Sequence, residues 1–354
     1  MVSRALTKPW TLSALKASQL KYATFLMGLP SAGSKSELEN LITEEIARPS
    51  RALESHRVLS VDMGIRNLAF CTLDVPKTTN QPWKVKTWKR VDLLEGLSHA
   101  NDEEAPQSKE SKLLTLAEQK RRKSAILASV SKTAFNPSSL SVIAHKITRD
   151  LLSYQPDTVL IERQRFRSGG AAAIQEWTVR VNMLESMIWA CMETIRHSND
   201  TSSGVFPSTI EVNPARVARF WSAGSYIDLL PPNDLFLGGV GSTEMAKLEP
   251  KKIDKQEKID VVRRWATNHG DSENHVSIEF EGEAAKVAKA FETKEKLSGS
   301  ATRKRDAVST MGKLDDLADC LLQAGAFVRW STNQQRIRNL VADAHIQHGT
   351  EIEK

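Results

Sequence analysis

Five carboxylates in three separate segments are the residues of this chain whose types and positions could do chemistry. Asp62 and Glu162 each close a short run of β-branched apolar residues, where a buried strand is expected to end. Asp315, Asp316 and Asp319 open an apolar stretch with helical spacing. Carboxylates at strand ends and at a helix start can converge on hard divalent cations, which prefer oxygen ligands. Two such cations, about 4 Å apart, are the common machinery for in-line cleavage of phosphodiesters. All five residues are therefore predicted to be catalytic ligands of two Mg²⁺ ions, for which Mn²⁺ would substitute.

The two strand-end carboxylates also have other interpretations. The Asp-x-Gly sequence at Asp62 is often only a turn, because Asp and Gly tolerate turn geometry. It also begins actin-like and sugar-kinase ATPases, but that fold needs further glycine-rich loops, and only residues 238–241 could supply one. A charge such as Glu162 at the end of a buried strand costs free energy unless it is paired or metal-bound. Arg163 or Arg165 could pair with it, so a plain salt bridge is the alternative.

Helical geometry ranks the three aspartates of the third segment. At about 100° per residue, Asp315 and Asp319 lie about 40° apart at the border of an apolar face, and Asp316 points about 60° further toward solvent. That face is formed by Leu314, Leu317, Ala318, Leu321, Leu322 and Gly325. Asp315 and Asp319 are the first choice as ligands, and a three-residue spacing would instead pair Asp316 with Asp319. Helix capping alone would not need three carboxylates within five residues.

Basic residues near these carboxylates favour a phosphate-rich partner. The net charge of +6 points the same way, although many basic proteins bind no nucleic acid. Arg163, Arg165 and Arg167 follow Glu162 directly, where the scissile and neighbouring phosphates would lie. Arg216 and Arg219 follow a proline at an expected helix start, a position that suits phosphate. These five arginines are predicted to bind DNA phosphates.

Strands and helices are expected to alternate along the chain and to position these residues. Strands are predicted at 58–61, 68–73, 85–91, 158–161 and 210–212, the first two as a hairpin. Helices are predicted at 113–127, 140–152, about 174–196, from 214, near 251–265, at 313–329 and at about 333–347. Long loops are expected near 95–112 and over most of 222–300. Trp177, Trp189, Trp221 and Trp265 fall at core-like helical positions.

Residues 12–47 are predicted to form a compact pair of helices. Ser13 could cap the first helix, and Gly28 is placed to end it in the left-handed conformation. Ser34 and Glu37 form an S-x-x-E capping box for the second helix. Two short helices bury little surface, so the pair should pack against another part of the chain. The leucine, glycine and lysine spacing over this segment resembles the SAP motif, a helical DNA-binding module, which is assigned to residues 1–50. The basic, acid-poor start is also typical of a transit peptide.

The order of the elements resembles the ribonuclease H-like fold, an α/β fold with a mixed sheet flanked by helices. More narrowly, the Asp-x-Gly-x-x-Asn-Leu-Ala sequence beginning at Asp62 resembles a signature of the fungal mitochondrial Holliday-junction resolvases, relatives of bacterial RuvC. The segments 161–168 and 313–319 are similar to that family's second and third motifs. The resemblance assigns residues 55–348 to a resolvase domain. It also implies that the remaining polar motif residues contact DNA: Arg66, Asn67, Gln164 and Lys313.

The resemblance implies a structure-selective endonuclease that resolves four-way DNA junctions by paired, symmetric, metal-dependent nicks. A junction has a two-fold axis, so a C₂ homodimer is expected, with an interface that uses the apolar faces of long helices such as 174–196. The expected location is the mitochondrial matrix. No nucleotide cofactor is expected. A membrane is not expected as a partner either, because no apolar run approaches the length of a membrane span. Three isolated cysteines indicate buried thiols rather than a disulfide framework.

Three other functions are compatible with parts of the sequence. A ribonuclease H acting on RNA–DNA hybrids would use the same carboxylates. A junction-binding or DNA-maintenance protein without catalysis would keep the basic residues and have no need of the acids. An actin-like ATPase would use the Asp-x-Gly turn for phosphate. Metal-dependent nicking of a panel of junctions, hybrids and linear duplex separates the first two, and ATP hydrolysis tests the third.

Overall fold

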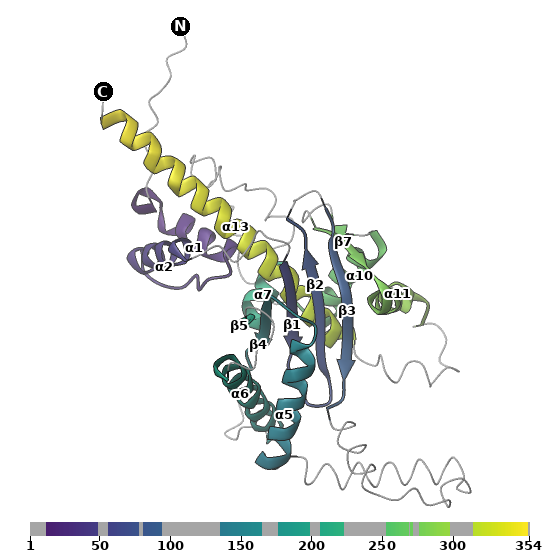
Figure 1. Cartoon of the computed structure of the whole chain (residues 1–354). Helices are drawn as coiled ribbons and strands as arrows, with labels where there is room; N and C mark the ends of the chain where they lie inside the picture. The colour runs from purple at the N-terminus through teal and green to yellow at the C-terminus, as the bar shows by residue number, and fades with distance from the viewer. Residues whose placement is uncertain are drawn as a thin grey trace, which may run out of the picture.

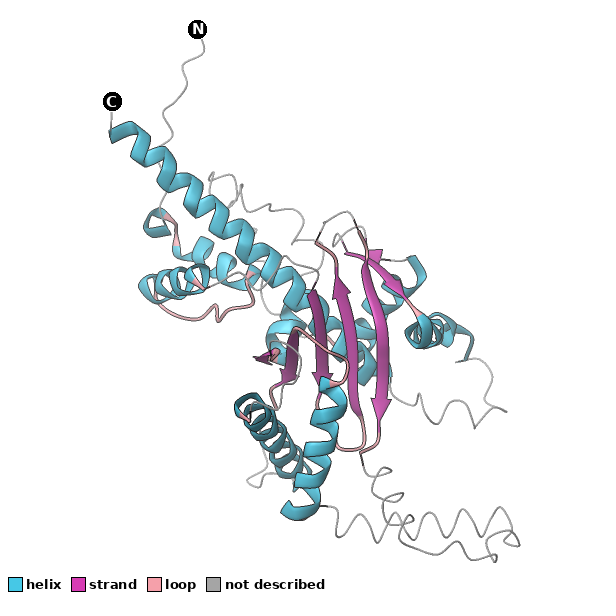
Figure 2. Ribbon diagram, viewed as in Figure 1, coloured by secondary structure: helices cyan, strands magenta, loops and turns pink. Residues whose placement is uncertain are grey.

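The computed structural model describes residues 12–48, 56–77, 81–93, 135–164, 176–198, 206–222, 253–268, 270–271, 276–297 and 314–352. At its centre is a seven-stranded mixed sheet with the order β5-β4-β1-β2-β3-β7-β6 (Figures 1 and 2). The strands are β1 (His56–Asp62), β2 (Leu68–Val75), β3 (Trp83–Val91), β4 (Thr158–Glu162), β5 (Ser208–Val212), β6 (Gly270–Asp271) and β7 (Val276–Phe280). β1, β2 and β3 are antiparallel neighbours, and β4 and β5 extend the sheet in parallel beyond β1. The predicted hairpin and mixed sheet are confirmed.

Helices cover both faces of the sheet. One face packs against α5 (Pro137–Leu152) and α6 (Glu176–His197). The other packs against α7 (Pro214–Ser222), α10 (Lys255–Asn268), α11 (Gly282–Leu297) and the long α13 (Leu314–Ile352). Neighbouring residues of β1 therefore enter different cores, with Val58 on the α13 side and Leu59 on the α5 side. This explains why β1 and β4 are continuous apolar runs, since strands buried on both faces show no alternation.

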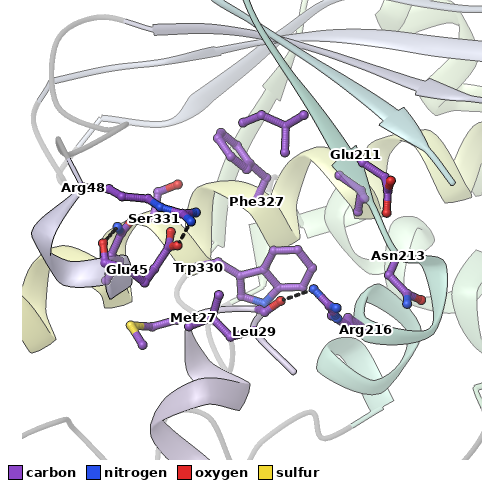
Figure 3. A pocket seen from close by; sticks show the side chains of 14 residues that line it. Met27, Leu29, Glu45, Arg48, Glu211, Asn213, Arg216, Phe327, Trp330 and Ser331 are labelled. Carbon is purple, nitrogen blue, oxygen red and sulfur yellow. Dashed lines mark hydrogen bonds and ion pairs between the residues drawn. The ribbon is translucent and has the colours of Figure 1, made fainter. Parts of the chain in front are cut away.

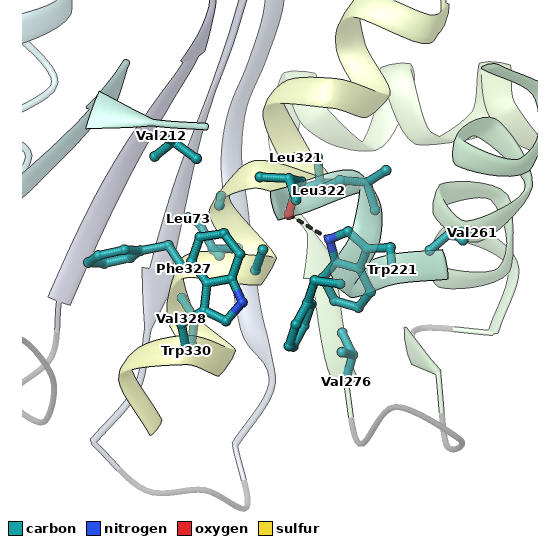
Figure 4. Packing of buried hydrophobic residues seen from close by; sticks show 14 of the residues in the cluster. Leu73, Val212, Trp221, Val261, Val276, Leu321, Leu322, Phe327, Val328 and Trp330 are labelled. Carbon is teal, nitrogen blue, oxygen red and sulfur yellow. Dashed lines mark hydrogen bonds between the residues drawn. The ribbon is translucent and has the colours of Figure 1, made fainter. Parts of the chain in front are cut away.

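Indole groups fix α13 against its neighbours. The Trp221 indole donates to the backbone oxygen of Leu322 at 2.8 Å, as Figure 4 shows. A Cβ atom at Gly325 would lie 3.1 Å from Trp265 and 3.2 Å from Trp221, so the absence of a side chain there permits close packing. Trp221 and Trp265 are buried as predicted. Trp177 is 42% exposed, so its predicted core position is wrong.

The N-terminal helical pair is confirmed and shares a core with the α13 side of the sheet. It consists of a 3-10 turn (Leu12–Ala14), α1 (Ala17–Leu26) and α2 (Lys35–Ala47). The predicted capping box is present: the Ser34 backbone N–H donates to Glu37 Oε2 at 2.7 Å, and Glu37 N–H donates to Ser34 Oγ at 3.3 Å. Gly28 is left-handed, with φ of +68°. The predicted cap at Ser13 is wrong, because α1 is preceded by Lys16 at the N-cap position and Ser13 lies in the 3-10 turn.

Side chains of α13 bind the C-terminal ends of α1 and α2. Asn333 Nδ2 donates to Leu26 O at 3.0 Å, and Gln334 Nε2 donates to Glu45 O at 2.7 Å. Arg338 Nε donates to the backbone oxygen of Ile46 at 2.7 Å. The last carbonyls of a helix have no partner within the helix, so these amide and guanidinium donors satisfy them. The expectation that the pair packs against another part of the chain is confirmed.

Two predicted boundaries are wrong. Two final helices were expected, but α13 is one continuous helix of 39 residues. Ser331 and Asn333, at the expected break, are buried, and Asn333 donates to Leu26 O at the end of α1. Within the expected 222–300 loop, β7 pairs in parallel with β3, and α11 packs on the sheet. The helix near 251–265 is confirmed as α10. The segments 95–112 and 113–127 lie outside the described residues.

In the ranges that the structure describes, no helix is both long enough and apolar enough to span a membrane.

Candidate active site

Asp62 and Glu162 end two neighbouring parallel strands. The last paired residues of β1 and β4 are Val61 and Ile161, so the two carboxylates stand one position further along. The two side chains are close enough for Glu162 to act on the pKa of Asp62. Removal from water raises the pKa of Asp62 well above its usual value, and the charge of Glu162 raises it further. The sequence prediction that these two residues converge is met by the sheet register.

The start of α13 brings further acids to the same place. The charges of Asp319 and Asp316 both contribute to the raised pKa of Asp62. The pKa of Asp319 is itself raised, mainly by burial, and the charges of Glu162 and Asp315 add to the effect. Lys258 on α10 acts in the opposite direction, because its Nζ lies 2.6 Å from Asp319 Oδ1. Asp319 therefore interacts with acids on both sides, on the strands and within its own helix.

Asp315 and Asp316 point to different neighbours. Asp315 Oδ2 lies 2.5 Å from Lys255 Nζ of α10, and the aspartate side chain is 15% exposed. Asp316 Oδ2 lies 3.8 Å from Arg90 Nε of β3, and this aspartate is 19% exposed. The expected outward position of Asp316 is not found, since the two side chains are almost equally buried. Asp316, and not Asp315, is among the charges that raise the pKa of Asp62.

The donor set of this cluster suits a hard divalent cation. All of the candidate ligands are carboxylates, which are the ligands of Mg²⁺ and Mn²⁺. As the side chains stand, no three acidic, cysteine or histidine side chains of the described segments are close enough together to hold a metal ion. Lys255 and Lys258 each hold one of the α13 carboxylates by an ion pair. Metal binding at this cluster therefore requires these lysines to release Asp315 and Asp319, or the ion to use the other carboxylates.

Three basic residues beside the carboxylates were not predicted as site residues. Lys255 and Lys258 lie on the helix that the sequence predicted near 251–265. Arg90 joins the Asp-x-Gly turn to α13, because its Nη2 donates to Asn67 Oδ1 at 2.8 Å while its Nε faces Asp316. These pairings join residues far apart in the chain, so a single sequence gives little indication of them. The three-residue spacing of Lys255 and Lys258 on one helix was a weak hint.

Some of the predicted DNA contacts lie within the described residues, among them Arg163 and Gln164 directly after Glu162. Arg163 is exposed and forms an ion pair with Glu211 of β5 at 3.1 Å. The backbone N–H of Gln164 donates to Glu185 of α6 at 3.1 Å, and burial raises the pKa of this glutamate. Arg66 is exposed on the turn after β1. Of the other predicted contacts, Arg165, Arg167 and Lys313 lie outside the described residues.

Arg216 and Arg219 contact the helical pair. Arg216 Nη1 donates to Gly28 O at 3.2 Å, and burial lowers the pKa of its guanidinium. The Arg219 guanidinium lies over the Phe25 ring, 5.3 Å from its centroid. Both arginines of α7 thus help to hold α1 in place, a role that the sequence did not suggest.

A cavity of about 210 Å³ lies between the helical pair and the sheet (Figure 3). Its walls come from the ends of α1 and α2, from β5 and from α13. Arg48, Glu45, Glu211, Arg216 and Trp330 are among its lining residues, and none of the five candidate catalytic carboxylates is. The cavity is therefore separate from the acidic cluster.

Residues 58–337 match the family model described as "Mitochondrial resolvase Ydc2 / RNA splicing MRS1". This chain belongs to that family. The matched range contains all five carboxylates and leaves out α1 and α2. The family description names two activities, a resolvase and an RNA-splicing protein, so membership alone does not choose between them.

Two curated relatives align with this chain over most of their length. A mitochondrial cruciform cutting endonuclease 1 from Schizosaccharomyces pombe is 24% identical over 335 residues, which cover 93% of this chain and 97% of the relative. A protein of the same name from Saccharomyces cerevisiae is 23% identical over 342 residues, 92% of this chain and 85% of the relative. The crystal structure of the yeast mitochondrial Holliday junction resolvase Ydc2 superposes with a TM-score of 0.50 at 22% identity, covering 94% of this chain and 99% of that one. The predicted ribonuclease H-like resolvase fold is confirmed.

Proposed function

We propose that this member of the family is an endonuclease that resolves four-way DNA junctions by paired, symmetric nicks. The observation that carries the proposal is the meeting of Asp62 and Glu162 with the aspartates of α13. A protein that only bound nucleic acid would have no use for like charges gathered at raised pKa, since their repulsion costs stability. The names of the two relatives, both cruciform cutting endonucleases, favour the resolvase activity over RNA splicing.

The acidic cluster would hold Mg²⁺ or Mn²⁺, two ions per site. Asp62, Glu162 and Asp319 are the proposed ligands, completed by Asp316 rather than Asp315, because the charge of Asp316, and not that of Asp315, adds to the raised pKa of Asp62. When bound, such ions activate the attacking water and stabilise the leaving 3′-oxygen. The chain's own contribution is to fix the carboxylates on two strand ends and one helix. Lys255 and Lys258, which pair with Asp315 and Asp319, would supply positive charge to a DNA phosphate bound beside these carboxylates.

The DNA-binding surface would combine the cluster's surroundings with the helical pair. Arg66 and Arg163 are exposed beside the ends of β1 and β4 and would bind backbone phosphates. Phosphate contacts position the substrate without reading its sequence, which suits recognition of a junction by shape. The pair α1–α2 presents Lys16 and Lys21 to solvent and would bind one arm of the junction. Its docking on α13 would hold that arm at a fixed distance from the cluster.

Two symmetric nicks require two active sites, so we propose a homodimer with a two-fold axis. The helix α6 buries one face against the sheet and carries two partly exposed apolar residues, Trp177 at 42% and Val179 at 41%. These residues make the N-terminal part of α6 a candidate for the dimer interface.

Both relatives carry the word mitochondrial in their names, which supports a mitochondrial location for the proposed function. The matrix, where mitochondrial DNA lies, is the expected compartment.

A substrate panel tests the proposed function. The purified chain would be incubated with a mobile four-way junction, an RNA–DNA hybrid and a linear duplex, each with Mg²⁺ and with chelator. The proposal expects paired nicks in opposite strands of the junction, only with the metal, and little cleavage of the duplex. Preferred cleavage of the hybrid would favour a ribonuclease H. Tight junction binding without nicking in either metal would favour a non-catalytic DNA-maintenance role.

A further inference from the structure

A buried glutamine of α13 touches both catalytic strands directly beneath their carboxylates. Gln323 is 3% exposed, and its Nε2 donates to Ser60 Oγ at 3.0 Å. The same nitrogen lies 3.3 Å from Val61 O on β1 and 3.5 Å from Leu160 O on β4. One amide group therefore reaches the two strands that end in Asp62 and Glu162. Burying an amide costs free energy unless it is hydrogen-bonded, so these hydrogen bonds constrain the orientation of the Gln323 side chain as well as the space that it fills.

The spacing of Gln323 along α13 matches the spacing of its partners along β1. Gln323 follows Asp319 by four residues, which is about 6 Å along a helix. Ser60 precedes Asp62 by two residues, which is about 6.7 Å along a strand and returns to the same face of the sheet. The distance between the two residues is therefore almost the same on the helix as on the strand. The Gln323 amide contacts Ser60, and the charge of Asp319 acts on Asp62.

Apolar packing alone does not fix this alignment. Leu317 and Leu321 are buried in the same part of α13, but apolar contacts are non-directional and tolerate small shifts of the helix along its axis. Two indoles also bind backbone oxygens of α13, Trp221 of α7 at Leu322 and Trp88 of β3 at Leu317. These bonds come from α7 and β3, whereas those of Gln323 reach the two strands that carry the carboxylates. A slide of one residue along the helix axis is about 1.5 Å. Such a displacement would break the hydrogen bond to Ser60 Oγ and would move Asp319 away from Glu162 by a similar amount. Repulsion between the carboxylates favours that movement, so a directional contact is needed to oppose it.

We propose that Gln323 is a positioning residue that sets the register of α13 on β1 and β4, and thereby holds Asp316 and Asp319 opposite Asp62 and Glu162. The proposal rests on the proposed function, because it assigns Gln323 to the assembly of that site. Gln323 touches neither substrate nor metal in this arrangement. Its effect passes through the placement of the carboxylates, in the manner of groups that orient the ligands of a metal.

The test compares two isosteric substitutions on one helix. Gln323→Met keeps an unbranched side chain of similar volume and removes the donor. Gln334→Met does the same three turns later, where the buried amide donates to Glu45 O at 2.7 Å and lies far from the acidic cluster. Each variant and the wild type would be measured by thermal unfolding in chelator, by Mn²⁺ titration followed by electron paramagnetic resonance, and by single-turnover junction cleavage. Ser60→Ala, a smaller change at the same contact, provides a second test if Gln323→Met does not fold.

The proposal expects both methionine variants to lose similar thermal stability, but only Gln323→Met to bind Mn²⁺ more weakly, by about 10-fold to 100-fold. Its cleavage rate should recover in part at high Mn²⁺, with junction affinity unchanged. Ser60→Ala should weaken Mn²⁺ binding in the same direction by a smaller factor. Mn²⁺ affinity within threefold of wild type in Gln323→Met, or an equal loss in Gln334→Met, would overturn the role of Gln323. A wild-type protein that binds no Mn²⁺, or binds it and nicks no junction, would contradict the proposed function itself.

Discussion

Replacing Asp315 and Asp316 separately by Asn gives the sharpest internal test of the site. Asn keeps the size and most hydrogen bonding of Asp, so the comparison isolates charge and metal ligation. Counting helical angles favoured Asp315 as the ligand. The structure instead joins Asp315 to Lys255 and makes Asp316 an electrostatic neighbour of Asp62. We therefore expect the larger loss of cleavage in Asp316→Asn.

The size of each effect follows from the contacts. Asp315→Asn removes an ion pair in which the aspartate side chain is 15% exposed and the lysine side chain is 79% exposed. Solvent around the lysine screens the pair and keeps its contribution near that of surface pairs, about 0–1 kcal/mol, so Asp315→Asn should slow cleavage by less than about fivefold. Asp316→Asn removes a proposed metal ligand, and metal ions contribute several kcal/mol of transition-state stabilisation. A loss of about 3 kcal/mol corresponds to more than 100-fold in rate.

Parallel single-turnover rates on one junction, with protein in excess and saturating Mg²⁺, measure both variants under the same conditions. Thermal unfolding and junction binding in chelator serve as controls for folding and DNA affinity. We expect the two rates to differ by at least about 20-fold, with Asp316→Asn the slower. A larger loss in Asp315→Asn would refute the choice of Asp316 and would return the ligand pair to Asp315 and Asp319.

Three further predictions concern stability and DNA affinity. The raised pKa of Asp62 means that its ionisation opposes folding at all pH values above the unfolded-state pKa of about 3.9. In chelator, Asp62→Asn should therefore raise the unfolding temperature at pH 7, and the gain should vanish as the pH falls toward 4; a lower unfolding temperature at pH 7 would contradict this. Lys16→Ala should flatten the slope of log affinity against log salt by about 0.9 if that residue contacts a phosphate, and an unchanged slope would remove it from the DNA surface. Gly28→Ala should destabilise the protein by about 2–4 kcal/mol in urea unfolding, through backbone strain and overpacking, because the new Cβ would lie 2.3 Å from Trp330. Gly282→Ala, with φ of +53° and nothing within 4 Å of the new Cβ, is the matched control and should lose less than half as much.

The sequence was sufficient for the parts of the site that depend on local pattern. Apolar runs ending in Asp62 and Glu162 predicted two strand ends, and the order of elements resembled a ribonuclease H-like fold. The capping box at Ser34 and the left-handed Gly28 were predicted correctly, because each depends on residues within a few positions. Local rules of this kind need no knowledge of the rest of the chain.

The errors came from contacts between distant segments. Angular counting put Asp316 toward solvent because it considered α13 alone, whereas β3 brings Arg90 to that side of the helix. The strand β7 has only five residues, and its pairing with β3 determines its conformation more than its own composition does. The sequence predicted two helices, at 313–329 and about 333–347, where α13 is continuous, and Asn333 near the expected break binds the Leu26 carbonyl at the end of α1. Local sequence patterns predict helices and strands well, but they predict poorly which other segments pack against them.

Asp62 is proposed to serve metal-dependent cleavage of four-way junctions rather than folding or DNA binding. Cleavage and binding of the same synthetic junction would be measured for wild type and for Asp62→Asn, in Mg²⁺. We expect the folded Asp62→Asn protein to bind the junction as tightly as wild type or more tightly, because a negative charge near the phosphates is gone, and to produce no paired nicks. Near-wild-type nicking by this variant would rule out the proposed role of Asp62.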